Sequence, residues 1–360
     1  MGPPTGWPSW GPQQPWGQQQ WPGGPPPPNG GGGKTKWILG GLAIALAIAL
    51  AVVITVVLVR PDNSENGPTT AGSSGADAEF ASANDTGPVT IITEEPTCDA
   101  WNAIAREYTG TAESIKWDDR NRTVSATSWT AEQRATYEDM KKALTKAADQ
   151  TVNLTKATPH RTMRVVYEQF IAYARTFAER IPTYTVEDND LMTAVNGSSA
   201  ALTNICGAIT YRSAQAVAPR MSAVSEPTGV ARPEEAGAPT RLLVEPNPVC
   251  TDWESMTNKF DSDSNAWNAI DKSVPAEDWT PEQESITEAV IPVMAANADE
   301  LEHLGRKSGN PRFEDLAVLA AQYRRALVVS LPSYTTKDVY LALSAVNLNR
   351  LVFGACKAAS

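Results

Sequence analysis

The sequence predicts an all-α protein with a disordered N-terminal tail, one transmembrane helix and two tandem four-helix-bundle modules, each closed by a disulfide bond. Three observations predict this architecture. One run of 23 residues lacks any charged side chain, a long segment of the chain occurs twice, and apolar residues recur every third or fourth position through both copies.

Residues 1–36 form the predicted tail, which we expect to be disordered and cytoplasmic. Its first 33 residues carry no ionisable side chain and are dominated by Pro, Gly, Gln and Trp. Such a composition offers no periodic apolar face that could offset the entropy cost of folding. The stretch 25–28 is four prolines, which favours a polyproline II helix that aromatic grooves can bind. The alternative is a low-complexity tether without a dedicated partner.

Residues 37–59 form the predicted transmembrane helix. At about 1.5 Å per residue the run spans roughly 34 Å, enough for a hydrocarbon core of roughly 30 Å. The run is too long, and starts too far from the N-terminus, for a cleaved signal peptide. Lys34 and Lys36 precede it and Arg60 follows it, which favours a cytoplasmic N-terminus.

Residues 60–88 are rich in Gly, Pro, Ser, Asn and Asp, so we expect a flexible stalk. Module 1 (89–212) and module 2 (241–360) follow, joined by a linker rich in Pro, Ala and Gly (213–240). The two modules match at a shift of 150 to 152 residues. The matching pairs are Cys98 with Cys250, Trp101 with Trp253, Trp117 with Trp267, Trp129 with Trp279, Tyr173 with Tyr323, Arg175 with Arg325, and Cys206 with Cys356.

Each module is predicted to contain four amphipathic helices. In module 1 the apolar faces run from Trp101, from Tyr137, from Met163 and from Leu191. Capping signals mark where helices begin: Thr130-x-x-Gln133 and its counterpart Thr280-x-x-Gln283, Thr185-x-x-Asp188, Thr158 before Pro159, and Asn310 before Pro311. Pro292 falls inside the second helix of module 2, where it is expected to kink or split that helix.

The four cysteines predict two disulfide bonds within the modules. In an up-down-up-down bundle, the start of the first helix and the end of the fourth lie at the same end. Cys98 can therefore reach Cys206, and Cys250 can reach Cys356; buried free thiols are the alternative. Disulfide bonds require an oxidising compartment, so we expect residues 61–360 outside the cytoplasm.

The sequence carries no recognisable catalytic or metal-binding motif, and we expect no enzymatic activity, cofactor or metal ion. His160 and His303 are the only histidines, and neither is repeated between the modules. Arg175 and Arg325, each two residues after Tyr173 or Tyr323, are the repeated polar residues of most interest. They could bind an anionic ligand, or form salt bridges with Asp188 and Asp338 that hold the third helix to the fourth.

The Pro/Gly/Gln/Trp-rich tail, the Lys34-Thr35-Lys36-Trp37 stretch and the Ala/Val/Ile-rich helix together resemble the proline-rich single-pass membrane proteins of actinobacteria, especially mycobacteria. The resemblance covers mainly residues 1–60. It implies a plasma-membrane setting with the modules in the cell envelope, and it assigns no catalytic residue.

The exported part (61–360) has 27 Lys and Arg against 41 Asp and Glu, so its formal charge is near -14. An acidic surface excludes nucleic acid as a partner class and favours neutral or cationic partners. The leading hypothesis is a non-catalytic, membrane-anchored binding or scaffolding protein whose partner is an envelope protein or a cell-wall component. The alternatives are a sensor that signals to the cytoplasmic tail and an envelope hydrolase with an unrecognised site.

Overall fold

The computed structural model describes residues 79–360. The predicted tail, the predicted transmembrane helix and most of the predicted stalk lie outside the described residues.

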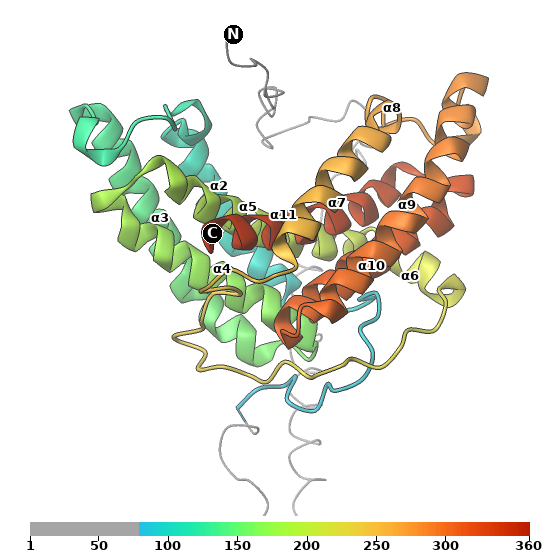
Figure 1. Ribbon diagram of the computed structural model, residues 1–360, viewed down its shortest axis with the longest axis horizontal. Helices are drawn as coiled ribbons and strands as arrows, with labels where there is room; N and C mark the ends of the chain where they lie inside the picture. The colour runs from blue at the N-terminus through green and yellow to red at the C-terminus, as the bar shows by residue number, and fades with distance from the viewer. Residues whose placement is uncertain (1–78) are drawn as a thin grey trace, which may run out of the picture. The chain divides into compact units, whose positions relative to one another are not determined.

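The described residues form an all-helical structure without a β-strand, as the sequence predicts (Figure 1). Module 1 consists of α2 (Cys98–Ser114), α3 (Ala131–Ala157), α4 (Arg161–Arg180) and α5 (Asn189–Thr210). Module 2 consists of α7 (Cys250–Asp263), the short α8 (Asn265–Asn268), α9 (Pro281–Lys307), α10 (Pro311–Ser330) and α11 (Val339–Ala358). The linker begins with the short α6 (Ser213–Val217). Eight 3₁₀ turns complete the helical part: Trp117–Asp119, Ala126–Ser128, Ile181–Thr183, Val186–Asp188, Ala218–Arg220, Ala276–Asp278, Leu331–Ser333 and Thr336–Asp338.

The predicted capping signals act where the sequence places them, except at Thr158. Thr158 follows the last residue of α3, and α4 begins only at Arg161 after His160, whose side chain makes no cap hydrogen bond. The Thr130 and Thr280 hydroxyls accept from the backbone N–H groups of Gln133 and Gln283, and both pairs form complete capping boxes. Asn310 caps α10. The expectation for Pro292 is wrong in one respect, because α9 runs without interruption from Pro281 to Lys307 and Pro292 does not split it.

The third helix of each module is its core. Residues 161–174 of α4 and 313–324 of α10 are all buried, so both helices are enclosed on every side. A helix in such a position needs no polar face, whereas α3 and α9 alternate buried and exposed residues. Trp101 and Trp253 are fully buried against this core, as their place on the apolar stripes predicts.

Both predicted disulfide bonds are present. Cys98 bonds to Cys206 and Cys250 bonds to Cys356, each with a Cα–Cα separation of 5.4 Å. Each bond ties the start of a module's first helix to the last turns of its fourth.

The two modules are packed against each other along α5 and α11, which lie side by side at the centre (Figure 1). The helices are antiparallel, since Ala194 lies against Gly354 and Gly197 lies against Leu351. A Cβ atom on Gly197 would be 2.4 Å from the Leu351 backbone nitrogen, and one on Gly354 would be 2.5 Å from that of Ala194. The backbones thus touch at both glycines. We call this contact the α5–α11 seam.

The linker is bound to both modules along its length. The Arg306 guanidinium of module 2 donates to the carbonyls of Ser225 and Glu226, and the Arg164 guanidinium of module 1 donates to that of Ala231. The Gln169 amide donates to the Thr240 carbonyl. The last residues of the predicted stalk are likewise held, because Phe80 and Ser82 are buried against the bundle.

Candidate functional site

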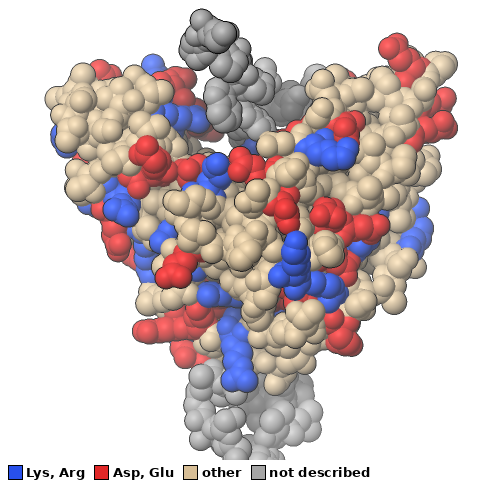
Figure 2. Space-filling model, in the orientation of Figure 1, with Lys and Arg blue, Asp and Glu red and all other residues tan. Residues whose placement is uncertain are grey.

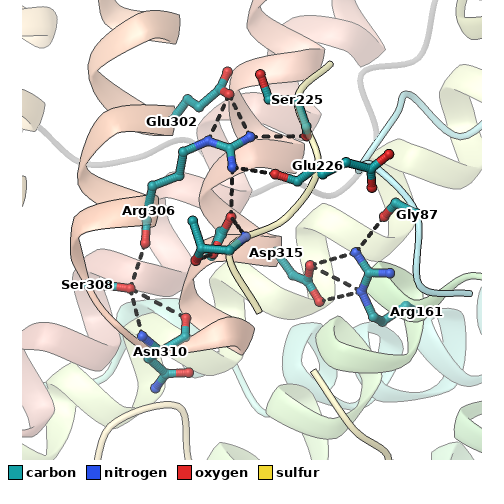
Figure 3. A network of polar contacts seen from close by, with 12 residues as sticks. Gly87, Arg161, Ser225, Glu226, Glu302, Arg306, Ser308, Asn310 and Asp315 are labelled. Atoms are coloured by element: carbon teal, nitrogen blue, oxygen red, sulfur yellow. Dashed lines mark hydrogen bonds and ion pairs between the residues drawn. The ribbon is translucent and has the colours of Figure 1, made fainter. Parts of the chain in front are cut away.

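A buried ion pair joins the two modules at the N-terminal ends of their core helices. Arg161 is the first residue of α4, and Asp315 lies in the second turn of α10. The Arg161 Nε lies 3.0 Å from Asp315 Oδ2, and its Nη2 lies 3.1 Å from Asp315 Oδ1. The side chains are 1% and 0% exposed. The pair is therefore bidentate and sealed from solvent (Figure 3).

Arg161 also binds the segment that leads into module 1. Its backbone N–H donates to the Asp85 carboxylate at 2.7 Å, and its Nη2 donates to the Gly87 carbonyl at 3.0 Å. One side chain therefore fixes α4, α10 and residues 85–87 together. Burial raises the pKa of Asp315 to about 6, while the hydrogen bond and charge of Arg161 oppose the rise.

A second buried pair lies one turn further along α4. The Arg164 guanidinium donates to the Glu168 carboxylate at 2.8 Å and to the Ser82 hydroxyl at 2.9 Å. Both charged side chains are 1% exposed. Burial raises the pKa of Glu168, and the nearby Arg164 acts against it.

A third group lies on module 2 beside the linker. Arg306 binds Glu302 at 2.9 Å (Figure 3). It also binds Glu314 at 3.0 Å, and the Thr228 backbone N–H donates to Glu314 at 2.9 Å. The arginines of all three groups bind both a carboxylate and a backbone carbonyl of the linker or of the leading segment. We call the three groups the inter-module network. Arg161–Asp315 joins the two modules directly, and the other two groups each bind the linker to one module.

Replacing Asp315 by leucine is expected to destabilise the fold by about 3 kcal/mol, because the buried Arg161 would lose its bidentate partner and keep only the partly exposed Asp85 carboxylate, whose Oδ1 lies 3.6 Å from Nη1. The double variant Arg161→Met/Asp315→Leu is expected to recover most of that loss, since no buried charge is left unpaired. Urea unfolding of both variants and of Arg161→Met completes the double-mutant cycle. A double variant no more stable than Asp315→Leu would contradict this account of the pair.

Tyr173 and Tyr323 lie where each module meets the segment that leads into the other. The fully buried Tyr173 of module 1 lies next to the backbone of Leu242 and Leu243, and the fully buried Tyr323 of module 2 lies next to that of Ile92. Burial raises the pKa of both phenols well above their ordinary range. The two tyrosines therefore belong to the contact between modules, and neither faces solvent.

The expected salt bridges from Arg175 to Asp188 and from Arg325 to Asp338 are wrong. Arg175 pairs with Asp149 of α3 at 2.7 Å, and Arg325 pairs with Asp299 of α9 at 2.8 Å. The arginines thus hold the third helix to the second. Asp188 and Asp338 instead accept from the backbone N–H groups of Thr185 and Thr335 in capping boxes. Arg175 also donates to the Gly237 carbonyl of the linker.

A cation lies over a tryptophan ring in the loop after the first helix of each module. The Arg120 Cζ is 3.6 Å from the Trp117 ring centroid, and the Lys272 Nζ is 4.0 Å from that of Trp267. Lys272 also donates to the carbonyls of Trp267 and Ile270. Burial nevertheless lowers the pKa of Lys272 to about 8.

This lowered pKa predicts a pH dependence of stability. Between pH 8 and the ordinary lysine pKa, the unfolded chain holds a proton that the folded chain has released, so the contribution of Lys272 to stability rises with pH across that window. Below pH 8 its contribution is constant. Urea midpoints of the wild type and Lys272→Met, compared from pH 7 to pH 10, should diverge in favour of the wild type above pH 8. If the urea midpoints of the two proteins changed with pH in the same way, the lowered pKa of Lys272 would be contradicted.

Within residues 79–360, no group of three or more His, Cys, Asp or Glu side chains is placed to hold a metal ion. Thr336–Ala358 is long and apolar enough to cross a membrane, with a mean hydropathy of 1.4, but 61% of its most apolar stretch is buried inside the protein. Its packing against α5, α7 and α10 accounts for that composition. On the face that Figure 2 shows, acidic and basic side chains are interspersed.

The residues of the inter-module network are not repeated between the modules, so the duplication does not reveal them. Arg161 and Asp315 match Pro311 and Val165 of the other module, and Arg164 matches Glu314. Asp149 and Asp299, the actual partners of Arg175 and Arg325, are themselves repeated at a shift of 150 residues. Because these aspartates are repeated at the same shift as the arginines, the sequence does contain an indication of the correct salt bridges.

Comparisons with known proteins identify relatives of the whole described region. Residues 80–360 match a family described as mycobacterial ESX-1 associated protein. An uncharacterized protein of Mycolicibacterium smegmatis (strain MKD8) is 41% identical over 351 residues, which cover 97% of this chain and 91% of that protein. No solved structure matches.

Proposed function

The chain belongs to the mycobacterial ESX-1 associated protein family, and from this premise we propose that it is a membrane-anchored scaffold on the extracytoplasmic side of the cell envelope, acting in connection with the ESX-1 secretion system. Its partner in this proposal is an envelope protein, and its role is to present a rigid surface to that partner. The 23-residue apolar run at 37–59 supplies the anchor.

The observation that carries this proposal is the union of two disulfide-closed bundles into one body. The α5–α11 seam joins them at the backbone, and the inter-module network joins them through Arg161 and Asp315. A surface held in one shape loses little conformational entropy when a partner binds, which favours a scaffolding role. The two disulfide bonds favour an oxidising compartment.

The scaffold is tested by in-cell crosslinking of the full-length chain. We expect an ESX-1 component or another envelope protein to be recovered with the full chain and to be absent with a control chain that ends at residue 88, which keeps the tail, anchor and stalk. Identical recovery from the two chains would contradict a scaffolding role for the modules. Loss of the gene is also expected to reduce ESX-1 secretion, and the control chain is expected not to restore it.

The location has its own test. Rapid acid quenching of cells, followed by alkylation and mass mapping, reports the oxidation state of all four cysteines in vivo. Complete oxidation, with Cys98 linked to Cys206 and Cys250 linked to Cys356, is the expected result. Reduced thiols in the folded protein would place the modules in a reducing compartment and would refute the location.

A further inference from the structure

The outward face of α9 in module 2 is apolar where the matching face of α3 in module 1 is polar. The two helices are both 27 residues long and correspond residue for residue at a shift of 150. The middle of α9 carries six apolar residues at exposed or half-buried positions, which we call the α9 patch: Ile286, Ala289, Ile291, Pro292, Ala295 and Ala296. Their counterparts on α3 are Thr136, Asp139, Lys141, Lys142, Thr145 and Lys146, and none of these is buried either.

Packing inside module 2 does not account for the α9 patch. α9 packs on α7 and α10 and lies on the outer side of the module (Figure 1). Its buried side chains are others, among them Thr287, Val290 and Met294, and their counterparts on α3 are buried as well. Module 1 closes a bundle of the same design with polar residues at the six positions. Contiguous apolar side chains that face solvent without a packing role are typical of a surface that binds another protein.

The charges around the α9 patch are of one sign. Glu282, Glu284 and Glu288 lie before or beside it and Glu300 lies after it, and all four side chains are exposed. From residue 281 to residue 305 the sequence contains no lysine or arginine, whereas the matching part of α3 contains four. A partner that is complementary to this surface is therefore apolar at its centre and basic on both sides.

Pro292 adds a hydrogen-bond acceptor to the same surface. Proline has no backbone N–H, so the Glu288 carbonyl, one turn earlier in α9, receives no hydrogen bond from position 292. Glu288 and Pro292 are both exposed, so a donor from outside the helix can reach this carbonyl. The matching residue of α3, Lys142, has the N–H that Pro292 lacks. A lysine or arginine of a partner supplies a donor of the required kind.

We propose that the α9 patch binds an apolar segment of an envelope protein that is flanked by lysine or arginine residues. The apolar side chains of the segment cover the patch, and its basic groups lie against the glutamates on either side. At about 1.5 Å per residue, positions 286–296 span roughly 16 Å, which is the length of three helical turns. This inference rests on the proposed scaffolding role and deepens it, because it names the surface that is used and the chemistry of the partner.

The test is site-specific photocrosslinking in cells, with the photoreactive residue benzoylphenylalanine in place of Ala296 in the full-length chain. The control chain carries the same residue in place of Lys146, the matching position of α3. We expect only the chain labelled at position 296 to crosslink to a second protein, through an apolar segment bordered by lysine or arginine. The proposal would be overturned by a lack of crosslinks at position 296, by crosslinks only within the chain or to a second copy of it, or by a mapped segment with acidic borders.

Variants of α9 separate binding from packing. Ala289→Asp/Pro292→Lys installs the residues of module 1 at two exposed positions, so stability in urea should not fall, while the crosslink at position 296 should decrease about tenfold or more. Glu288→Lys should also decrease the crosslink, because it repels the basic borders of the partner. Glu138→Lys, at the matching position of α3, should leave the crosslink unchanged. A crosslink of undiminished yield in Ala289→Asp/Pro292→Lys would refute the proposal.

Failure of this inference is distinguishable from failure of the scaffolding role. If the full-length chain and the chain that ends at residue 88 recover the same proteins, the scaffolding role fails and the α9 patch fails with it. If only the full-length chain recovers an envelope protein, and Ala289→Asp/Pro292→Lys recovers as much of it as the wild type, the scaffolding role stands and the α9 patch alone is refuted. Loss of that protein from the variant, with stability retained, is the result that we expect.

Discussion

Replacing Gly354 by valine is expected to destabilise the folded protein by about 5 kcal/mol, because the new side chain has no room in the α5–α11 seam. A Cβ at this position would lie 2.5 Å from the Ala194 nitrogen and 3.0 Å from its Cα. Backbone atoms cannot turn aside as a flexible side chain can, so the two helices would have to separate along the seam. The free energy of unfolding of residues 79–360 in urea measures the effect.

Gly110 provides the matched control. It also lies within a helix, α2, but nothing lies within 4 Å of the Cβ that a substitution would add. Gly110→Val is therefore expected to change stability by no more than about 0.5 kcal/mol. Equal losses of stability at the two positions would contradict backbone contact at the seam, because helix propensity by itself does not disfavour valine relative to glycine.

Removing either disulfide bond is expected to cost about 4 to 5 kcal/mol in the chain-entropy model, since the bonds close loops with sequence separations of 108 and 106 residues. The variants are Cys98→Ala/Cys206→Ala and Cys250→Ala/Cys356→Ala. Because the seam and the network couple the modules, each variant should lower the stability of both modules in one shared transition. Unfolding of the altered module alone, with the other unaffected, would contradict that coupling.

Much of the architecture could be predicted from the sequence because it depends on local signals. The spacing of apolar residues predicts the helices, and Thr130 and Thr280 mark where two of them begin. One cysteine near the start and one near the end of each copy predict the two disulfide bonds. Each of these features is repeated in the two modules. A repeat doubles the evidence for whatever the copies share.

The contact between the modules could not be predicted in the same way, because it uses residues that the copies do not share. Gly197 and Gly354 match Asn347 and Asn204, so neither glycine has a glycine counterpart. An antiparallel contact between two related helices brings non-equivalent positions together, and the comparison of copies cannot find such pairs.

The salt bridge predicted between Arg175 and Asp188 is wrong for a related reason. Two carboxylates, Asp149 and Asp188, lie at plausible distances along the chain, and the choice depends on the rotation of α4 about its axis. Asp188 is occupied by the capping box of Thr185, and Asp149 faces Arg175 across α3 and α4. The spacing of residues along the chain predicts on which side of a helix a residue lies, but it does not predict which other helix packs against that side.

The central claim, that the two modules are one body joined along α5 and α11, is tested most directly at Tyr211 and Tyr340. Their rings are stacked with centroids 5.0 Å apart and an interplanar angle of 7°, and Tyr211 is 49% exposed. Photo-oxidative coupling of the full-length protein in native membranes, followed by peptide mapping, should yield an intramolecular dityrosine between them. The link should be lost in Tyr211→Phe and reduced in Gly354→Val. Oxidation of Tyr211 without any coupling to Tyr340 of the same chain would show that the modules are not joined as described.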